Sequence, residues 1–296
     1  MTFRPASKEA ARKAIGSLDG LPEDVRNAFL PRGDFEPIPF PGPNDWLAVH
    51  FEPGQTFADF VQSRPNTPDA LRNTIYVQPL EDFETENAPP LQKLSQFAES
   101  FFSVPVQTLS ASGISGRKVT TRTNPYTRQP QLLTRDVLGH LRQVLPANGF
   151  CIVGITMRDL YPAPSWNFVF GEASLEDRVG VFSFARYDPQ FYGIEAPNRE
   201  ALVLRRSCKV LAHETAHMFG IQHCVFFNCL MNGSNHLDES DRRPLHLCPV
   251  DLRKLYYSIS FDVGRRFLAL LDFARSAGFV DEIDWLEKRL RTQGSH

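Results

Sequence analysis

The chain has 296 residues, 42% of them hydrophobic and 22% charged, and a formal net charge of −2. This composition is typical of a globular protein with a sizeable core, and the length predicts one or two domains. The nearly neutral charge excludes a general electrostatic attraction to nucleic acid or to an anionic membrane surface. No apolar run approaches the roughly 18 residues that cross a bilayer. From the net charge and from the absence of such a run, we expect neither nucleic acid nor a membrane as a partner.

The cysteines and the first residues bear on the cellular compartment. Residues 1–16 mix basic, acidic and small side chains, and they lack the apolar centre of a secretory signal. The chain has five cysteines, and three of them cluster within residues 224–248. In a reducing compartment, clustered cysteines indicate a metal site rather than disulfides. We therefore expect a cytoplasmic protein, and we expect it to be a monomer.

The first 70 residues show no recognisable chemistry. Residues 1–30 have a short helical pattern, and five prolines within 31–43 predict an extended linker. A strand is predicted at 46–51 and a helical turn at 57–62. We predict that residues 1–70 form an accessory extension, which packs on a catalytic domain of residues 71–296.

From residue 73 onward, strand and helix patterns alternate along the chain. Strands are predicted at 74–77, 104–109, 150–156, 166–171 and 180–187, helices at 90–102 and 133–145, and a polar loop at 110–130. This order predicts a mixed α/β sheet with helices packed against it. A long helix is predicted from about 198 to 219, and further helices at 252–259, 262–276 and 279–291. We divide the catalytic domain into an N-terminal subdomain (71–220) and a smaller, helical C-terminal subdomain (221–296).

The sequence HETAHMFGIQH, at 213–223, predicts a metal site on the long helix. His213 and His217 are four residues apart, so their imidazoles lie on one helix face and can bind one cation. Gly220 allows a left-handed turn at the helix end, after which His223 can return as a third ligand. Three protein ligands leave one position open, as in catalytic zinc sites. Glu214 can face the same metal without binding it. The alternative is a helix with unrelated surface histidines.

A second group of ligand-type residues follows directly, with the spacing C-x4-C … C-x2-D. Its members are Cys224, Cys229, Cys248 and Asp251. This spacing predicts a second, structural zinc site with a carboxylate oxygen as the fourth ligand. Asp251 could instead cap the helix predicted at 252–259, and His236 or His246 could take its place as ligand. Cys208 lies about 18 Å along the long helix and is too distant to join the group.

These motifs resemble the metzincin clan of zinc peptidases. The stretch HC-x4-C-L-M-N-G-S-N-H that begins at His223, followed by the Cys-Pro pair at 248–249, is similar to the archaemetzincins, closest to the archaemetzincin-2 branch of that family. The resemblance extends over about residues 73–273, and the upstream segments that carry it are 150–157, 159–162, 165–171 and 181–187.

The resemblance implies the fold and the roles of the site residues. It implies a catalytic zinc in a cleft between two subdomains, held by the three histidines, with Glu214 as the general base. Met231 would form the Met-turn, an apolar floor beneath the metal. The family's second zinc uses four cysteines, and Asp251 stands here in the place of the fourth. The cofactors expected are one catalytic and one structural Zn²⁺. The edge strand that pairs with substrate backbone would comprise Asn167, Phe168, Val169, Phe170 and Gly171.

The predicted function is a zinc-dependent metallopeptidase that hydrolyses peptide bonds through a zinc-activated water. His236 is the local candidate for a second group that stabilises the oxyanion. The sequence does not decide between an aminopeptidase and an endopeptidase. The alternative function is a catalytically silent, metal-stabilised binding or scaffold protein of the same fold. The intact Glu214 argues against this alternative, because a purely structural metal site has no use for a base.

Overall fold

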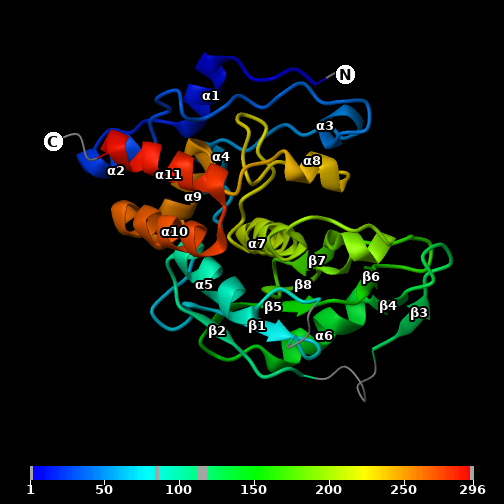
Figure 1. Cartoon of the computed structure of the whole chain (residues 1–296). Helices are drawn as coiled ribbons and strands as arrows, with labels where there is room; N and C mark the ends of the chain where they lie inside the picture. The colour runs from blue at the N-terminus through cyan, green and yellow to red at the C-terminus, as the bar shows by residue number, and fades with distance from the viewer. Residues whose placement is uncertain (1–2, 84–86, 113–118, 294–296) are drawn as a thin grey trace. The chain divides into compact units, whose positions relative to one another are not determined.

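A computed structural model describes residues 3–83, 87–112 and 119–293 (Figure 1). The chain forms two compact units: unit 1 comprises residues 1–66 with 219–296, and unit 2 comprises residues 67–218. Within the loop predicted at 110–130, residues 113–118 lie outside the described residues. The predicted division into an accessory extension (1–70) and a catalytic domain (71–296) assigns functions to these parts, and it stays a prediction.

Unit 2 is built on a five-stranded sheet with the order β2-β1-β5-β8-β7. All neighbouring strands are parallel except the edge strand β7, which is antiparallel to β8. The strands are β1 (Thr74–Pro79), β2 (Val106–Thr108), β5 (Gly149–Thr156), β7 (Gly171–Ser174) and β8 (Val179–Ser183). The central strands β1 and β5 are buried along their whole length, as expected for strands covered on both faces. The predicted mixed α/β sheet is confirmed.

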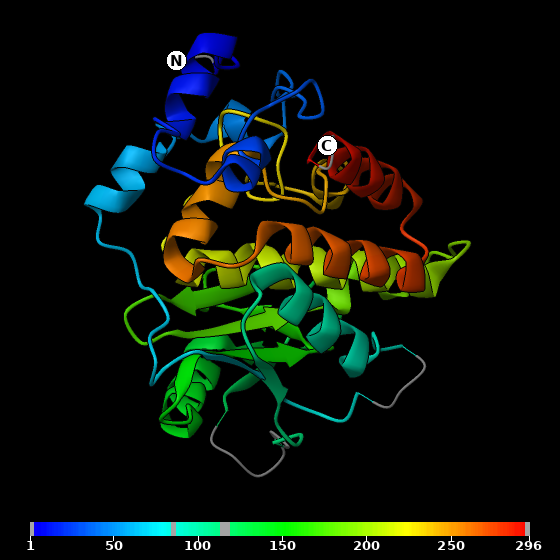
Figure 2. The ribbon, with the colours of Figure 1, turned by 90° about the vertical axis from the view of Figure 1, so that its left-hand side faces the viewer.

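Helices cover both faces of this sheet. They are α5 (Leu91–Phe102), α6 (Thr134–Val144) and α7 (Arg199–Met218). The α6 and α7 helices lie on opposite faces, and α5 packs beside α7 (Figures 1 and 2). The aromatic stripe of α5 is core, since Phe97, Phe101 and Phe102 are buried. The sheet thereby fixes one face of α7, the helix that carries the first two histidines of the motif.

A small second sheet, with the order β3-β4-β6, completes the strands of unit 2. It consists of β3 (Thr121–Thr123), β4 (Pro130–Leu133) and β6 (Asp159–Tyr161). Its β3 strand lies inside the stretch predicted as a polar loop. The strand predicted at 180–187 ends early, because β8 is followed by two short 3₁₀ helices, η1 (Ala185–Tyr187) and η2 (Pro189–Tyr192).

The predicted edge strand at 166–171 is wrong. Only Gly171 belongs to β7; Asn167, Phe168, Val169 and Phe170 precede it without forming a strand. Backbone groups of this segment have several different partners: Val169 N donates to the Leu160 carbonyl in an isolated bridge (3.0 Å), and side chains occupy the carbonyl of Asn167. The carbonyl oxygen of Asn167 accepts hydrogen bonds from Arg122 Nη2 (3.0 Å) and from Gln131 Nε2 (2.9 Å). The edge of the five-stranded sheet is therefore β7 itself.

Unit 1 combines the start of the chain with its last third. Its helices are α1 (Lys8–Ile15), α2 (Glu23–Ala28), α3 (Trp46–Val49), α4 (Phe57–Gln62), α8 (Leu237–Asp241), α9 (Pro249–Ile259), α10 (Val263–Ala277) and α11 (Val280–Gln293). The α1 and α4 helices contact α9, and α2 contacts α10 and α11, as the blue, orange and red ribbons of Figure 1 show. The first 66 residues thus share a core with the C-terminal helices.

The strand predicted at 46–51 is wrong, because α3 begins there. The Glu239 carboxylate accepts the Trp46 backbone N–H, with oxygens at 3.0 and 3.1 Å. Local turns provide acceptors for backbone N–H groups that follow: Ala48 N donates to the Asp45 carbonyl (3.0 Å), and His50 N donates to the Trp46 carbonyl (2.8 Å). A glutamate almost two hundred residues away in sequence therefore takes the backbone N–H at the start of α3.

Gly54 allows the chain of residues 44–56 to approach Val225 closely. Its φ is +78°, and an added Cβ would lie 2.5 Å from Val225 Cγ2. We expect Gly54→Ala to lower the free energy of unfolding by roughly 1–3 kcal/mol, measured by urea denaturation. Gly20→Ala is the matched control, because Gly20 has a φ of +77° and nothing within 4 Å of the added Cβ. Equal losses in the two variants would show that the close approach has no energetic weight.

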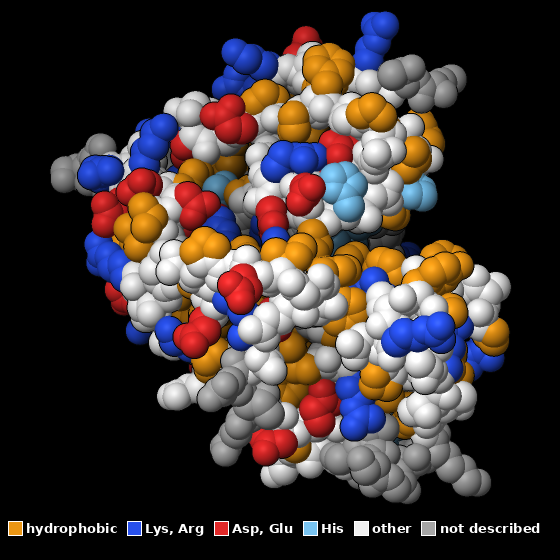
Figure 3. All heavy atoms as spheres, turned by 45° about the vertical axis from the view of Figure 1, so that its right-hand side comes forward, with side chains coloured by type: hydrophobic (Ala, Val, Ile, Leu, Met, Phe, Trp, Pro, Cys, Tyr) orange, Lys and Arg blue, Asp and Glu red, His pale blue; other side chains and the backbone are white. Residues whose placement is uncertain are grey.

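The surface agrees with the nearly neutral charge of the chain. On the face drawn in Figure 3, Lys and Arg side chains are interspersed with Asp and Glu side chains. Within the described part of the chain, no helix is both long enough and apolar enough to cross a membrane.

Candidate metal centres

Two histidines of the motif lie on α7, in unit 2. The Nε2 atoms of His213 and His217 are 3.1 Å apart, and the two rings are nearly perpendicular, at 89°. Two nitrogens bound to one tetrahedral zinc at about 2.0–2.1 Å would lie about 3.3 Å apart. The helix therefore holds the pair at a separation that fits one zinc ion, as the four-residue spacing predicted. Glu214, between them, is half-buried on the same helix.

His223 lies in unit 1, after the end of α7. Gly220 has a φ of +81°, which is the left-handed turn that the sequence predicted. His223 Nδ1 lies 2.7 Å from Oε1 of Glu52. Metal-binding histidines commonly hold a carboxylate through the ring nitrogen that does not bind the metal, so a metal at His223 would be bound through Nε2. The sequence reasoning missed Glu52, because it stands 171 residues before His223.

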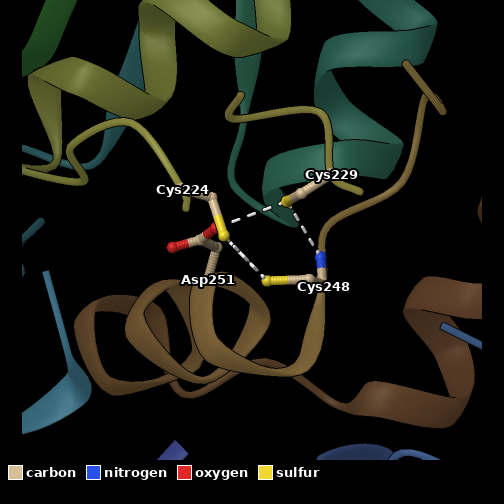
Figure 4. Close-up of side chains that lie close together, drawn as sticks. All are labelled: Cys224, Cys229, Cys248 and Asp251. Carbon is tan, nitrogen blue, oxygen red and sulfur yellow. Dashed lines mark hydrogen bonds between the residues drawn. The ribbon is translucent and has the colours of Figure 1, made fainter. Parts of the chain in front are cut away.

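The second group of ligand-type residues comes together within unit 1 (Figure 4). Cys248 and Asp251 lie at the start of α9, and Cys224 and Cys229 lie on the loop after α7. Cys224 Sγ is 3.6 Å from Cys248 Sγ, and Asp251 Oδ2 is 3.3 Å from the sulfurs of both Cys229 and Cys248. Ligands of one tetrahedral zinc would show sulfur–sulfur distances of about 3.8 Å and sulfur–oxygen distances of about 3.5 Å. The donors are thus arranged to fit a zinc ion.

Asp251 does not cap α9, because the N-cap residue is Cys248. Its carboxylate lies among the thiols, and its second oxygen, Oδ1, accepts a hydrogen bond from the buried Lys254 ammonium at 2.8 Å. Burial, reinforced by the Cys224 thiolate, raises the pKa of the Asp251 carboxyl to about 6, against the attraction of Lys254. Ionised, the cluster would carry four negative charges against the one positive charge of Lys254. A buried excess of negative charge favours a dication.

Comparison with known proteins identifies the family. A profile of peptidase family M54 matches residues 130–256. Archaemetzincin-2 of Rattus norvegicus is 40% identical over 276 residues, a match that covers 83% of this chain and 77% of the relative. The chain belongs to the archaemetzincin family. Archaemetzincin-1 of Homo sapiens is 31% identical over 260 residues, covering 78% of this chain and 52% of that relative.

Solved structures of two relatives are also similar to this archaemetzincin. A zinc-dependent peptidase from Methanocorpusculum labreanum is 26% identical, with a TM-score of 0.48, covering 61% of this chain and 99% of that chain. Archaemetzincin from Archaeoglobus fulgidus, complexed with malonate, is 29% identical, with a TM-score of 0.44 and the same coverage. Family membership makes this chain a zinc-dependent metallopeptidase that acts on peptides, as the sequence predicted.

Met231, the predicted Met-turn residue of this archaemetzincin, is fully buried and lies on the cysteine loop. Its carbonyl accepts a hydrogen bond from Cys224 N (2.8 Å), and its own N–H donates to Cys229 Sγ (3.5 Å). Asn232, which the sequence reasoning missed, donates to the carbonyls of Cys224 and Phe227. The position of Met231 therefore depends on the same loop that carries the cysteines.

The two histidines considered as alternatives have other partners. His236 caps α8 by accepting the Glu239 N–H at Nδ1 (3.2 Å), and its Nε2 lies 3.1 Å from Asp45 Oδ1. With both ring nitrogens engaged, we do not assign it a role with an oxyanion. His246 stacks on Trp285 at 3.6 Å and bonds Glu282, so it does not replace Asp251.

Proposed function

We propose that this archaemetzincin hydrolyses peptide bonds with His213, His217 and His223 as the ligands of one zinc ion. The observation that carries the proposal is the His213–His217 pair on α7, whose Nε2 separation of 3.1 Å suits one ion. His223 follows within six residues of His217, after the turn at Gly220. When bound, zinc lowers the pKa of a water and polarises a carbonyl.

We infer that Glu214 is the general base. It lies on the same helix turn as the histidine pair, and its carboxylate can accept a proton from the attacking water and pass it to the leaving amine. A carboxylate next to a pair of metal-spaced histidines has no purpose in a silent scaffold. Glu214 therefore favours the enzyme over the binding protein.

We infer that the peptide substrate binds in an extended form. The antiparallel edge strand β7 offers backbone groups to such a peptide, because it pairs only with β8 among the strands of the described sheet. This assignment replaces the segment 167–170.

The five cysteines are free and buried, and the cytoplasmic location stays a prediction that rests on them.

We also propose that Cys224, Cys229, Cys248 and Asp251 hold a second, structural zinc. The prediction is two zinc ions per wild-type chain, measured by elemental analysis of protein purified without added metal. We expect one ion in Asp251→Ala and one in His217→Ala, since each variant loses a ligand of a different site. The control is Asp272→Ala, which removes an exposed aspartate on α10 and should keep both ions. A wild-type chain with one zinc, indifferent to Asp251→Ala, would contradict the structural site.

A further inference from the structure

Residues 44–56 of the N-terminal segment lie against the stretch that delivers His223. Glu52 makes the direct contact, at 2.7 Å from His223 Nδ1, and both side chains are largely buried, with 18% and 21% exposure. The same Glu52 oxygen accepts a hydrogen bond from the Trp46 indole Nε1 (2.6 Å). The indole also contacts the imidazole edge-on, with ring centroids 5.2 Å apart. The His223 ring is thus held by a carboxylate and by an aromatic ring that is nearly perpendicular to it.

The backbone before His223 is held by the same segment. Gln55 Nε2 donates to the Gly220 carbonyl (3.1 Å), and Gln55 Oε1 accepts the Gln222 N–H (3.1 Å). The Gln55 side chain is only 4% exposed, so both bonds lie away from competing water. The turn after α7 is therefore fixed by a residue three positions after Glu52.

Trp46, whose indole donates a hydrogen bond to Glu52, is itself fixed in place. The Trp46 backbone N–H is bonded by Glu239, which also pairs with Arg243 at 2.8 Å. Gly233 leaves space for the indole, since a Cβ there would lie 2.5 Å from Trp46 Cδ1. The carboxylate of Glu52 consequently sits between two rings whose positions are set by other parts of unit 1.

We propose that Glu52 is a positioning residue of the catalytic metal site. By accepting a hydrogen bond from His223 Nδ1, it selects the tautomer whose Nε2 lone pair is available for zinc, and it fixes the direction of that lone pair. The inference rests on the proposed function and deepens it. It assigns residues 44–56, which the sequence reasoning treated as accessory, to the metal site itself.

The test compares metal affinity in Glu52→Gln with that of wild type and of Glu36→Gln, in which an exposed glutamate earlier in the chain, outside residues 44–56, is changed. Cobalt is the probe, because thiolate ligands give it a charge-transfer band that histidine ligands do not, so the two sites are read separately. We expect the histidine site to bind Co²⁺ about 10–100-fold more weakly in Glu52→Gln, with the thiolate site unchanged. Unchanged affinity at the histidine site would overturn the inference.

A double-mutant cycle separates positioning from a general structural effect. In a His223→Ala background, Glu52→Gln should cause no further loss of Co²⁺ affinity, because the carboxylate acts only through that ring. Additive losses would overturn the inference. Failure of the proposed function gives a different result, namely Co²⁺ affinity that is already insensitive to His223→Ala alone. A loss of Co²⁺ affinity in His223→Ala but not in Glu52→Gln would contradict the role of Glu52 and would leave the proposed function standing.

Discussion

Glu214→Gln is expected to lower peptidase turnover by about 10²–10⁴-fold while the zinc content per chain stays unchanged. The amide has nearly the shape of the carboxylate but cannot accept the proton of the attacking water. Because Glu214 is not a metal ligand in the proposed site, the three histidines keep their ion. The measurements are cleavage of a library of unstructured peptides, followed by mass spectrometry, and zinc per chain.

The matched control for this experiment is Glu200→Gln. Glu200 is an exposed residue in the first turn of the same helix, α7, so the substitution makes the same chemical change away from the histidines. It should leave turnover at the wild-type level. Full activity in Glu214→Gln would show that another group takes the proton, whereas loss of zinc together with activity would show that Glu214 supports the metal instead.

Arg289→Met is expected to lower the free energy of unfolding by about 3–5 kcal/mol. Arg289 is fully buried on α11, and its guanidinium lies 2.7 Å from the equally buried Asp34 carboxylate. It also donates to the carbonyls of Leu30, Asn27 and Ala28. The substitution leaves a buried carboxylate and these carbonyls without their donor, and burying such groups unpaired is costly. Urea denaturation measures the loss.

Arg275→Met provides the comparison on the neighbouring helix. It breaks the Arg275–Glu287 ion pair, which has the same 2.7 Å separation but side chains that are 53% and 36% exposed. We expect a loss of about 0–1 kcal/mol, since water screens an exposed pair. If both arginine variants lost equal stability, the first 34 residues would not depend on the buried pair for their attachment to α11.

Much of unit 2 follows from local patterns in the sequence. The apolar run at 150–156 is the buried strand β5, and the helical spacing around Phe97 and Phe101 marks α5. These features were predictable because a buried strand and an amphipathic helix each repeat over a few residues. The strand predicted at 166–171 failed for the opposite reason. The side chains of Arg122 and Gln131, which take the Asn167 carbonyl, come from other strands and leave no local trace.

The sequence by itself determined the chemistry of this protein: the spacing of His213 and His217, the turn at Gly220, and the trio of cysteines. The histidine pair and the turn depend on residues a few positions apart, whose relative placement a helix or a turn dictates, whereas the cysteines were recognised by residue type and spacing. Only the tertiary structure placed Glu52 on His223 and Glu239 on the Trp46 backbone N–H. Contacts between residues far apart in the chain arise from packing of the whole unit, and local sequence patterns do not predict that packing.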